Sequence, residues 1–259
     1  MLCHSKITAH DESSSWAVLI HGLFGSHDNL NLLAKTLSST LNIIQLDLPD
    51  HGQSPRTEKF DFPYYCQMIM DTLAHHEIEK AHFIGHSLGG KMCMYIALSR
   101  PEMVASLTVA DIAPVNYPHR HQAVLHALET VDLTQVQNRN DIKQQFNSLL
   151  DDEGTQQFLL KSLYKNEQGN WSWRFNHRLL ARDYDKLIAW PELSTQYYGP
   201  TLFIKGQDSD YIVMEYQSTI LSLFPHATSK IINGTGHWLH AQKPLVFNRI
   251  VENFVNSSM

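Results

Sequence analysis

The stretch Gly85-His86-Ser87-Leu88-Gly89 determines the expected fold, because it joins two very different sequence patterns. Residues 81–84 before it are a short, mostly apolar run, and residues 88–100 after it have a helix-forming composition that stops before Pro101. A chain that turns abruptly from strand to helix strains the residue at the turn, and glycines two positions away relieve the crowding. The stretch therefore predicts a nucleophile elbow that presents the Ser87 hydroxyl at the C-terminal end of a strand.

Further apolar, strand-like runs lie on both sides of this elbow. Residues 16–20 and 42–48 precede it, and residues 104–110, 200–205 and 229–232 follow it. Helical patterns separate most of these runs, which is the order of a doubly wound, mostly parallel sheet. We therefore predict an α/β fold whose strand-end loops gather on one edge, where such sheets bind ligands.

The alternation of strands and helices stops between residues 118 and 191. This part has helical patterns without a strong buried strand, and it holds three of the five tryptophans. Because it leaves from the expected catalytic edge, we predict a helical cap over residues 118–191, with a dimerisation element as the alternative. Residues 1–117 and 192–259 then form the core domain.

Composition and charge argue against several classes of function. The formal net charge is −6 without a basic stripe, so nucleic-acid binding is not expected. Residues 1–6 lack the apolar segment of a signal peptide, and no run approaches the roughly 18 apolar residues of a membrane span. We therefore expect a cytoplasmic protein. Cys3, Cys66 and Cys93 have no C-x-x-C spacing, so neither a disulfide framework nor a zinc ribbon is expected.

The sixteen histidines suggest a metal site as one hypothesis. The candidate pairs are His75 with His76 and His119 with His121. No carboxylate or cysteine stands at ligand spacing around either pair, and adjacent helical side chains diverge. We expect solvated surface histidines, and no metal or cofactor.

A serine hydroxyl is a poor nucleophile near neutral pH, so it needs a base and an acid that orients the base. A glycine-rich loop after the last strand presents His237, which is the candidate base for Ser87. Carboxylates stand between the two in the sequence. The order serine, acid, histidine is the order found in α/β-hydrolases.

The strand-end loops resemble those of the capped α/β-hydrolase superfamily across nearly the whole chain outside the cap. The similarity is carried by residues 21–25, 47–54, 85–90 and 236–238. More narrowly, Gly85-His86-Ser87-Leu88-Gly89-Gly90-Lys91, together with Ala110-Asp111-Ile112-Ala113-Pro114, is similar to the YbfF-type bacterial esterases. The resemblance implies hydrolysis of short acyl esters, with acyl thioesters as a second class of substrate, and no cofactor.

The position of the acid departs from the commonest pattern of the superfamily. Most members carry it as the last residue of a G-x-x-D turn after the cap, and here Ser209 holds that slot between Asp208 and Asp210. Asp111 ends the strand after the elbow helix, a position that some hydrolases use, including the resembled family. We expect Asp111 to orient His237 and Ser209 to donate a hydrogen bond nearby, with Asp208 or Asp210 as the alternatives.

Two backbone amides are the expected oxyanion hole. We assign it to Leu23 and Leu88, with Phe24 as the fallback for the first. His86 directly precedes the nucleophile Ser87 in the sequence. Because the side chains of successive residues diverge, we expect His86 to pack beneath the elbow. Lys91 is expected to pair structurally, with a role near a carboxylated or phosphorylated substrate as the alternative.

Other reactions on the same scaffold stay open, because a fold does not dictate its chemistry. A lyase of the menaquinone-pathway type or a carbon–carbon hydrolase would use the same serine and histidine. A ligand-sensing protein would bind tightly and turn over slowly. Epoxide hydrolases and haloalkane dehalogenases are disfavoured, because they generally place an aspartate where Ser87 stands.

Overall fold

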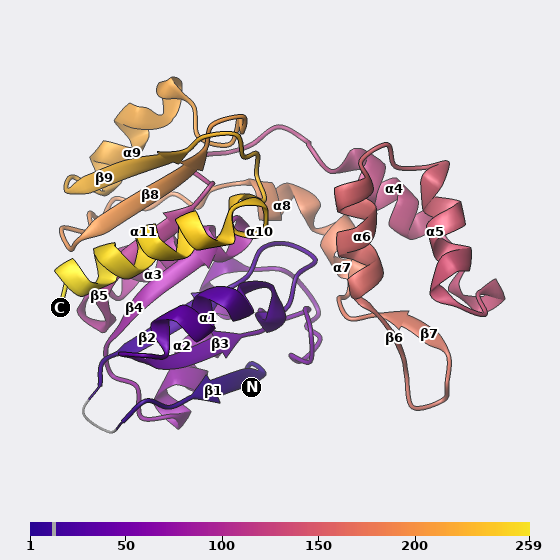
Figure 1. The fold of residues 1–259 in the computed structure, drawn as a ribbon, viewed down its shortest axis with the longest axis horizontal. Helices are drawn as coiled ribbons and strands as arrows, with labels where there is room; N and C mark the ends of the chain where they lie inside the picture. Colours follow the sequence, from indigo (N-terminus) through magenta and orange to yellow (C-terminus); the bar gives the residue numbers. More distant parts are fainter. Residues whose placement is uncertain (12–13) are drawn as a thin grey trace.

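A seven-stranded sheet forms the centre of the computed structural model, which describes residues 1–11 and 14–259 (Figure 1). Neighbouring strands run parallel, except that the edge strand β1 is antiparallel to β3. The predicted α/β class with a mostly parallel sheet is therefore confirmed. In spatial order the strands are β1 (Ser5–Thr8), β3 (Asn42–Leu46), β2 (Trp16–Ile20), β4 (Ala81–His86), β5 (Val104–Ala110), β8 (Thr201–Gly206) and β9 (Ala227–Ile232).

Helices cover both faces of the sheet, which explains why its inner strands are buried at nearly every position. Along β2, Val18 and Ile20 belong to one hydrophobic core, while Ala17 and Leu19 belong to a second core on the opposite face. The first core also contains side chains of α2 (Phe62–His75) and α3 (Leu88–Ser99). The second contains side chains of α1 (Asn31–Leu37) and α11 (Pro244–Ser257).

Shorter elements complete the part of the chain around the sheet. Most are single turns that lie next to the ends of strands. They are the 3₁₀ helices η1 (His27–Leu30), η2 (Pro101–Met103) and η4 (Met214–Tyr216), and the helices α9 (Gln217–Leu223) and α10 (Leu239–Gln242).

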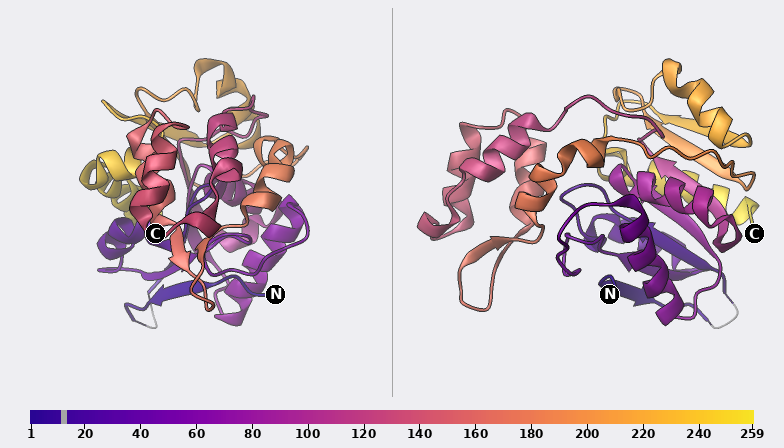
Figure 2. Two further views of the ribbon diagram at one scale, coloured as in Figure 1. Left: turned by 90° about the vertical axis from the view of Figure 1, so that its right-hand side faces the viewer. Right: turned by 180° about the vertical axis from the view of Figure 1, so that it is seen from behind.

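The chain between β5 and β8 holds a group of helices, the helical insertion, that stands beyond the C-terminal ends of the central strands (Figures 1 and 2). The insertion also contains a short antiparallel hairpin. Each of its two strands has three residues, which is too short to give a periodic pattern in the sequence. Its elements are α4 (Gln122–Thr130), η3 (Leu133–Gln135), α5 (Arg139–Asn147), α6 (Glu153–Lys161), β6 (Leu163–Lys165), β7 (Trp171–Trp173), α7 (His177–Arg182) and α8 (Tyr184–Ile188).

Candidate active site

The turn between β4 and α3 has the geometry of a nucleophile elbow. Ser87 occupies it with φ 52° and ψ −119°, a region that residues with a side chain rarely adopt. A Cβ added at Gly85 would lie 2.3 Å from the Gly89 carbonyl oxygen, and one added at Gly89 would lie 2.3 Å from the Ile20 carbonyl oxygen. Only glycine fits at these two positions, so the sharp turn can form and present the largely buried Ser87 hydroxyl to His237.

Three candidate side chains from distant parts of the chain meet at the C-terminal edge of the sheet. His237 Nε2 lies 3.0 Å from Ser87 Oγ, and His237 Nδ1 lies 2.8 Å from Asp111 Oδ2. A histidine that donates Nδ1–H to a carboxylate keeps Nε2 free to accept a proton. The arrangement can therefore take the proton from the Ser87 hydroxyl during a nucleophilic attack.

The carboxylate of Asp111 is fully buried and held from several sides. Its Oδ1 accepts the backbone N–H of Gly206 at 3.0 Å, and its Oδ2 accepts the hydroxyl of Ser209 as well as the bond from His237. Ser209 Oγ in turn accepts the N–H of Tyr211 at 3.2 Å. The turn that carries the acid in most of the superfamily thus contacts the Asp111 carboxylate, directly after β5, through Ser209.

The two alternative acids lie elsewhere. Asp208 is exposed to solvent, and Asp210 is exposed and forms an ion pair with Arg120 of the helical insertion. Among the described residues, the carboxylate bonded to His237 is that of Asp111.

Tyr211 is a site residue that the sequence reasoning missed. Its ring stacks on the imidazole of His237, with ring centroids 3.8 Å apart and an interplanar angle of 18°. The same Tyr211 ring also contacts a cation, because the Arg120 guanidinium lies 4.7 Å from the ring centroid. The only signal in the sequence was the place of Tyr211 directly after the strand-end turn that holds Ser209. This stack restricts the tilt of the histidine ring.

The loop after β2 approaches Ser87 closely. A Cβ added at Gly22 would lie 3.1 Å from Ser87 Cβ, and the Gly25 amide donates to the Gly22 carbonyl at 3.0 Å. Leu23 and Leu88 line the same small pocket as Ser87. Because Leu88 is the first residue of α3, its amide has no acceptor within the helix. Both amides thus belong to backbone segments that border the serine.

His86 is buried beneath the elbow. Its Nε2 lies 2.9 Å from the backbone carbonyl oxygen of His237, and its ring lies 4.3 Å from that of His240. Burial lowers the pKa of His86 well below its ordinary value, so the ring is neutral and can donate one N–H to that carbonyl. His86 holds the loop of His237 in place.

Lys91 makes a structural pairing, and its partners are backbone carbonyl groups. Its side chain is buried, and Nζ donates to the carbonyl oxygens of Ile188 and Ala189 at 2.6 and 2.7 Å, where the insertion returns to the core. No carboxylate of the described residues pairs with it, so the structural pairing is with backbone. Burial lowers the pKa of Lys91 to about 7.

Two small pockets meet at Ser87. One, of about 170 Å³, also borders His237, Trp238 and the insertion residues Phe158 and Leu159. The other, of about 40 Å³, extends toward α8. Leu23, Ser87, His121 and Tyr211 line both.

The histidine pairs singled out in the sequence do not form a metal site among the described residues. His119 pairs with Asp185 at 2.7 Å, and His121 Nδ1 contacts the Tyr184 hydroxyl at 2.7 Å. A different group, His4, His27 and Asp47, has ligand atoms within 4.8 Å of one another. It comes together only in the fold, because its members are far apart in the sequence.

Asp47 in that group already has protein partners. Its carboxylate accepts the backbone N–H of His27 at 2.6 Å and that of Gln53 at 2.8 Å, so it stabilises the loops without an ion. The three cysteine thiols, those of Cys3, Cys66 and Cys93, are buried and free.

Comparison with known proteins assigns the family. Residues 17–244 match the family described as alpha/beta hydrolase fold. The chain belongs to this family. It is 38% identical to Esterase YbfF of Escherichia coli (strain K12), over 97% of each chain. It is also 35% identical to an sn-1-specific diacylglycerol lipase of Mus musculus, over 92% of this chain and 80% of the lipase.

A solved structure agrees with these relatives. The structure described as a marine microorganism esterase has a TM-score of 0.94 and 29% identity, and the match covers 98% of this chain and 99% of that one. The predicted resemblance to YbfF-type esterases is therefore confirmed, and the relatives support a hydrolase of the esterase and lipase group. Within the described residues, no helix is both long enough and apolar enough to span a membrane.

Proposed function

We propose that this α/β-hydrolase is a serine carboxylesterase that hydrolyses small acyl esters through an acyl-enzyme intermediate. The observation that carries the proposal is the chain of hydrogen bonds from Ser87 Oγ through His237 to the buried Asp111 carboxylate. A hydrolase that activates a metal-bound water would not need a serine at a strained elbow with its oxygen aimed at a histidine.

The first half of the reaction forms the acyl-enzyme. Ser87 Oγ attacks the acyl carbon while His237 Nε2 takes the hydroxyl proton, and the carbonyl electrons move onto the oxygen. The amides of Leu23 and Leu88 donate hydrogen bonds to that oxyanion, each worth about 3 kcal/mol by analogy with other oxyanion holes. The tetrahedral intermediate then collapses, and the alcohol leaves with the proton that His237 returns to it.

The second half releases the acid. Water takes the place of the alcohol, His237 accepts its proton, and the resulting hydroxide attacks the acyl carbon. Ser87 Oγ leaves with the proton and the enzyme is restored. Throughout both halves Asp111 keeps the Nδ1–H tautomer of His237 and stabilises its positive charge, and Ser209 and Tyr211 position these two groups.

The helical insertion acts as a cap in this proposal. Phe158 and Leu159 of α6 border the larger pocket at Ser87, and Tyr184 of α8 borders the smaller one, so the cap helps to exclude water and selects the acyl group. Pockets of about 170 and 40 Å³ favour short acyl chains. Acyl thioesters are a second substrate class, because the same attack expels a thiol.

The test is a chain-length series of p-nitrophenyl esters measured on the wild type and on Ser87→Ala. We expect turnover to be highest for acetyl and propionyl esters and to fall in Ser87→Ala by a factor on the order of 10⁶. Retained turnover in Ser87→Ala would mean that another group is the nucleophile. A lyase or a ligand sensor would hydrolyse none of these esters appreciably, even as the wild type.

A further inference from the structure

His121 is the residue of the helical insertion that lines both the larger and the smaller pocket at Ser87. It directly precedes α4, at the start of the insertion. Its ring meets that of Phe24 edge to face, with ring centroids 6.4 Å apart and an interplanar angle of 87°. The insertion thus places an imidazole, packed against a core aromatic ring, in the wall of the catalytic cavity.

The Tyr184 hydroxyl determines which ring nitrogen of His121 carries the proton. Tyr184 is buried, and its oxygen accepts the backbone N–H of Arg120 at 3.4 Å. The hydroxyl proton also needs an acceptor, and within the described residues the recorded one is His121 Nδ1 at 2.7 Å. Burial lowers the pKa of His121 to about 4, so at pH 7 the ring is neutral and has a single N–H. With Nδ1 accepting, that N–H is at Nε2.

The Nε2–H group of His121 is available to a ligand. It has no hydrogen-bond partner in residues 1–11 and 14–259, and it is not among the fully buried polar atoms that lack one, so it keeps accessible surface. The two nitrogens of an imidazole point to nearly opposite sides of the ring. Because Nδ1 contacts Tyr184, which borders the smaller pocket and not the larger one, Nε2 points toward the larger pocket.

The larger pocket is the side on which the alcohol part of an ester would lie. His237 borders this pocket and does not border the smaller one. In the proposed reaction His237 returns the proton to the leaving oxygen, so that oxygen lies beside His237 and the alcohol extends into the larger pocket. The acyl chain then occupies the smaller pocket, which Leu88 and Leu187 line.

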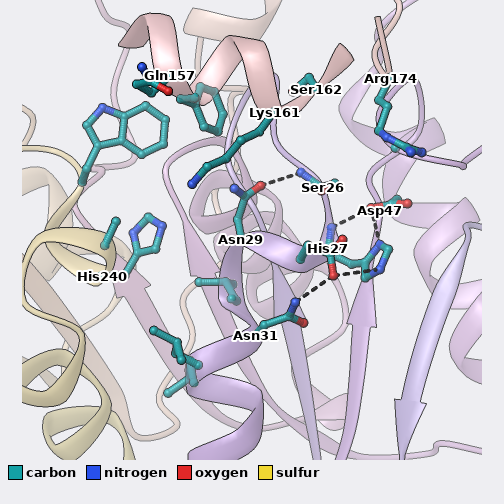
Figure 3. A pocket seen from close by; sticks show the side chains of 18 of the residues that line it. Ser26, His27, Asn29, Asn31, Asp47, Gln157, Lys161, Ser162, Arg174 and His240 are labelled. Carbon is teal, nitrogen blue, oxygen red and sulfur yellow. Dashed lines mark hydrogen bonds and ion pairs between the residues drawn. The ribbon is translucent and has the colours of Figure 1, made fainter. Parts of the chain in front are cut away.

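A third cavity, of about 840 Å³ and bordered by α6, η1 and α10, does not extend the larger pocket (Figure 3). Phe158 and Trp238 line both spaces, and their ring centroids are 4.4 Å apart, so the two contacting rings stand between them. The alcohol is therefore confined to the pocket of about 170 Å³ that His121 borders.

We propose that the Nε2–H of His121 binds an oxygen atom in the alcohol part of the substrate, so that the enzyme prefers esters whose alcohol carries an ether or hydroxyl oxygen beyond the ester group. This inference rests on the proposed ester hydrolysis. A hydrocarbon alcohol would displace water from the N–H and leave it without an acceptor, which costs affinity. An alcohol with an oxygen in reach replaces the lost hydrogen bond and is preferred in kcat/KM.

The preference is tested by comparing 2-methoxyethyl acetate with butyl acetate, which has a methylene group in place of the ether oxygen and the same length. His121→Phe keeps a ring beside Phe24 and removes the N–H. We expect it to lower the ratio of the two kcat/KM values, ether ester over butyl ester, by about 5-fold, the usual effect of one hydrogen bond between neutral groups. The intrinsic reactivities of the two esters cancel when this ratio is compared between variants.

Two further variants serve as controls. His126→Phe makes the same substitution at an exposed position of α4 and should leave the ratio at the wild-type value. In His121→Gln the side-chain amide can offer an N–H from nearly the same place, so this variant should keep a higher ratio than His121→Phe.

The outcomes separate this inference from the esterase proposal. A wild type that hydrolyses both esters, with the same ratio in His121→Phe, overturns the inference and leaves the esterase proposal standing. An equal fall of both kcat/KM values in His121→Phe also overturns it, because His121 would then act on the reacting ester group or on the fold. A wild type that hydrolyses neither ester contradicts the esterase proposal, and the inference falls with it.

The tautomer of His121 is measured without any turnover. Two-dimensional ¹⁵N–¹H NMR of the ring nitrogens, assigned by the signals missing in His121→Phe, should show the Nε2–H form at pH 7. Tyr184→Phe removes the hydroxyl that donates to Nδ1 and should shift the ring toward a mixture of both tautomers. An Nδ1–H form in the wild type would overturn the inference, because Nε2 could then not donate to the substrate.

Discussion

The Ser209 hydroxyl donates a hydrogen bond to the buried carboxylate of Asp111. Ser209 stands at the end of β8, in the slot where much of the superfamily carries its acid, while Asp111 stands at the end of the neighbouring strand β5. The two strand ends lie side by side, so a carboxylate on either one can reach the same histidine. This adjacency explains physically how the acid can move between strands while the geometry of the site is kept.

Replacement of Asp111 by Asn should lower kcat by about 10³-fold to 10⁴-fold, because an amide favours the wrong tautomer of His237. Asn tolerates the positive φ of 53° at this position, so the loop should keep its shape. The measurement is steady-state hydrolysis of p-nitrophenyl acetate, with Asp208→Asn as the matched control at an exposed carboxylate. Full activity in Asp111→Asn would refute the assignment of the acid.

Removal of the Ser209 hydroxyl should have a smaller effect. Ser209→Ala deletes one hydrogen bond to a charged group, so we expect kcat to fall by about 10-fold with little change in KM. Because Ser209 acts through Asp111, the pH at half-maximal kcat should also shift, which loss of stability alone would not cause. An unchanged pH profile and kcat would show that Ser209 does not position the acid.

The acid should be transferable to the neighbouring strand. In the inactive Asp111→Asn background, Ser209→Asp places a carboxylate at the end of β8, beside the position that it left. We expect the double variant to recover at least about 10-fold of the lost kcat, since the new carboxylate can accept the Nδ1–H of His237. Activity no higher than that of Asp111→Asn would mean that only β5 can orient the base.

Acid should destabilise the fold through buried histidines. Burial lowers the pKa of both His121 and His240 to about 4. A folded-state pKa below the unfolded value of about 6.5 gives stability that is complete above pH 6.5 and is lost as the pH falls toward 4. Each such histidine should cost about 2 kcal/mol between pH 7 and pH 5.

The histidine contribution can be isolated with His240→Phe, which keeps a ring in the buried site. Urea unfolding at pH 7 and pH 5 should show a smaller loss of stability in this variant than in the wild type. An identical loss in both proteins would contradict the prediction for His240.

Glycine at the elbow should be indispensable. Gly89→Ala would bring a Cβ to 2.3 Å from the Ile20 carbonyl oxygen, against backbone that cannot move aside. We expect a loss of about 3 kcal/mol or more in the free energy of unfolding. Gly236→Ala meets no atom within 4 Å and serves as the control. Equal stability of the two variants would show that the elbow relaxes.

Local patterns were enough to predict the sheet and the edge on which the candidate residues meet. The apolar runs predict buried strands, and these strands form. The glycines around Ser87 predict that backbone segments approach each other closely at the elbow, as they do at Gly85 and Gly89. Two contacts were not predictable. One is the stacking of the Tyr211 ring on the His237 imidazole, and the other is the pair of hydrogen bonds from Lys91 to the carbonyl oxygens of Ile188 and Ala189. Both contacts depend on how distant segments pack together, and no local pattern encodes that.

The central claim, that Ser87 activated by His237 forms an acyl-enzyme, is tested most directly by rapid-quench mass spectrometry with p-nitrophenyl acetate. The account predicts one acetyl group per chain, mapped to the peptide of Ser87, and no acetylation in Ser87→Ala or His237→Ala within the same time. Acetylation at another residue, or ester hydrolysis without any acetylated Ser87 in the wild type, would contradict it.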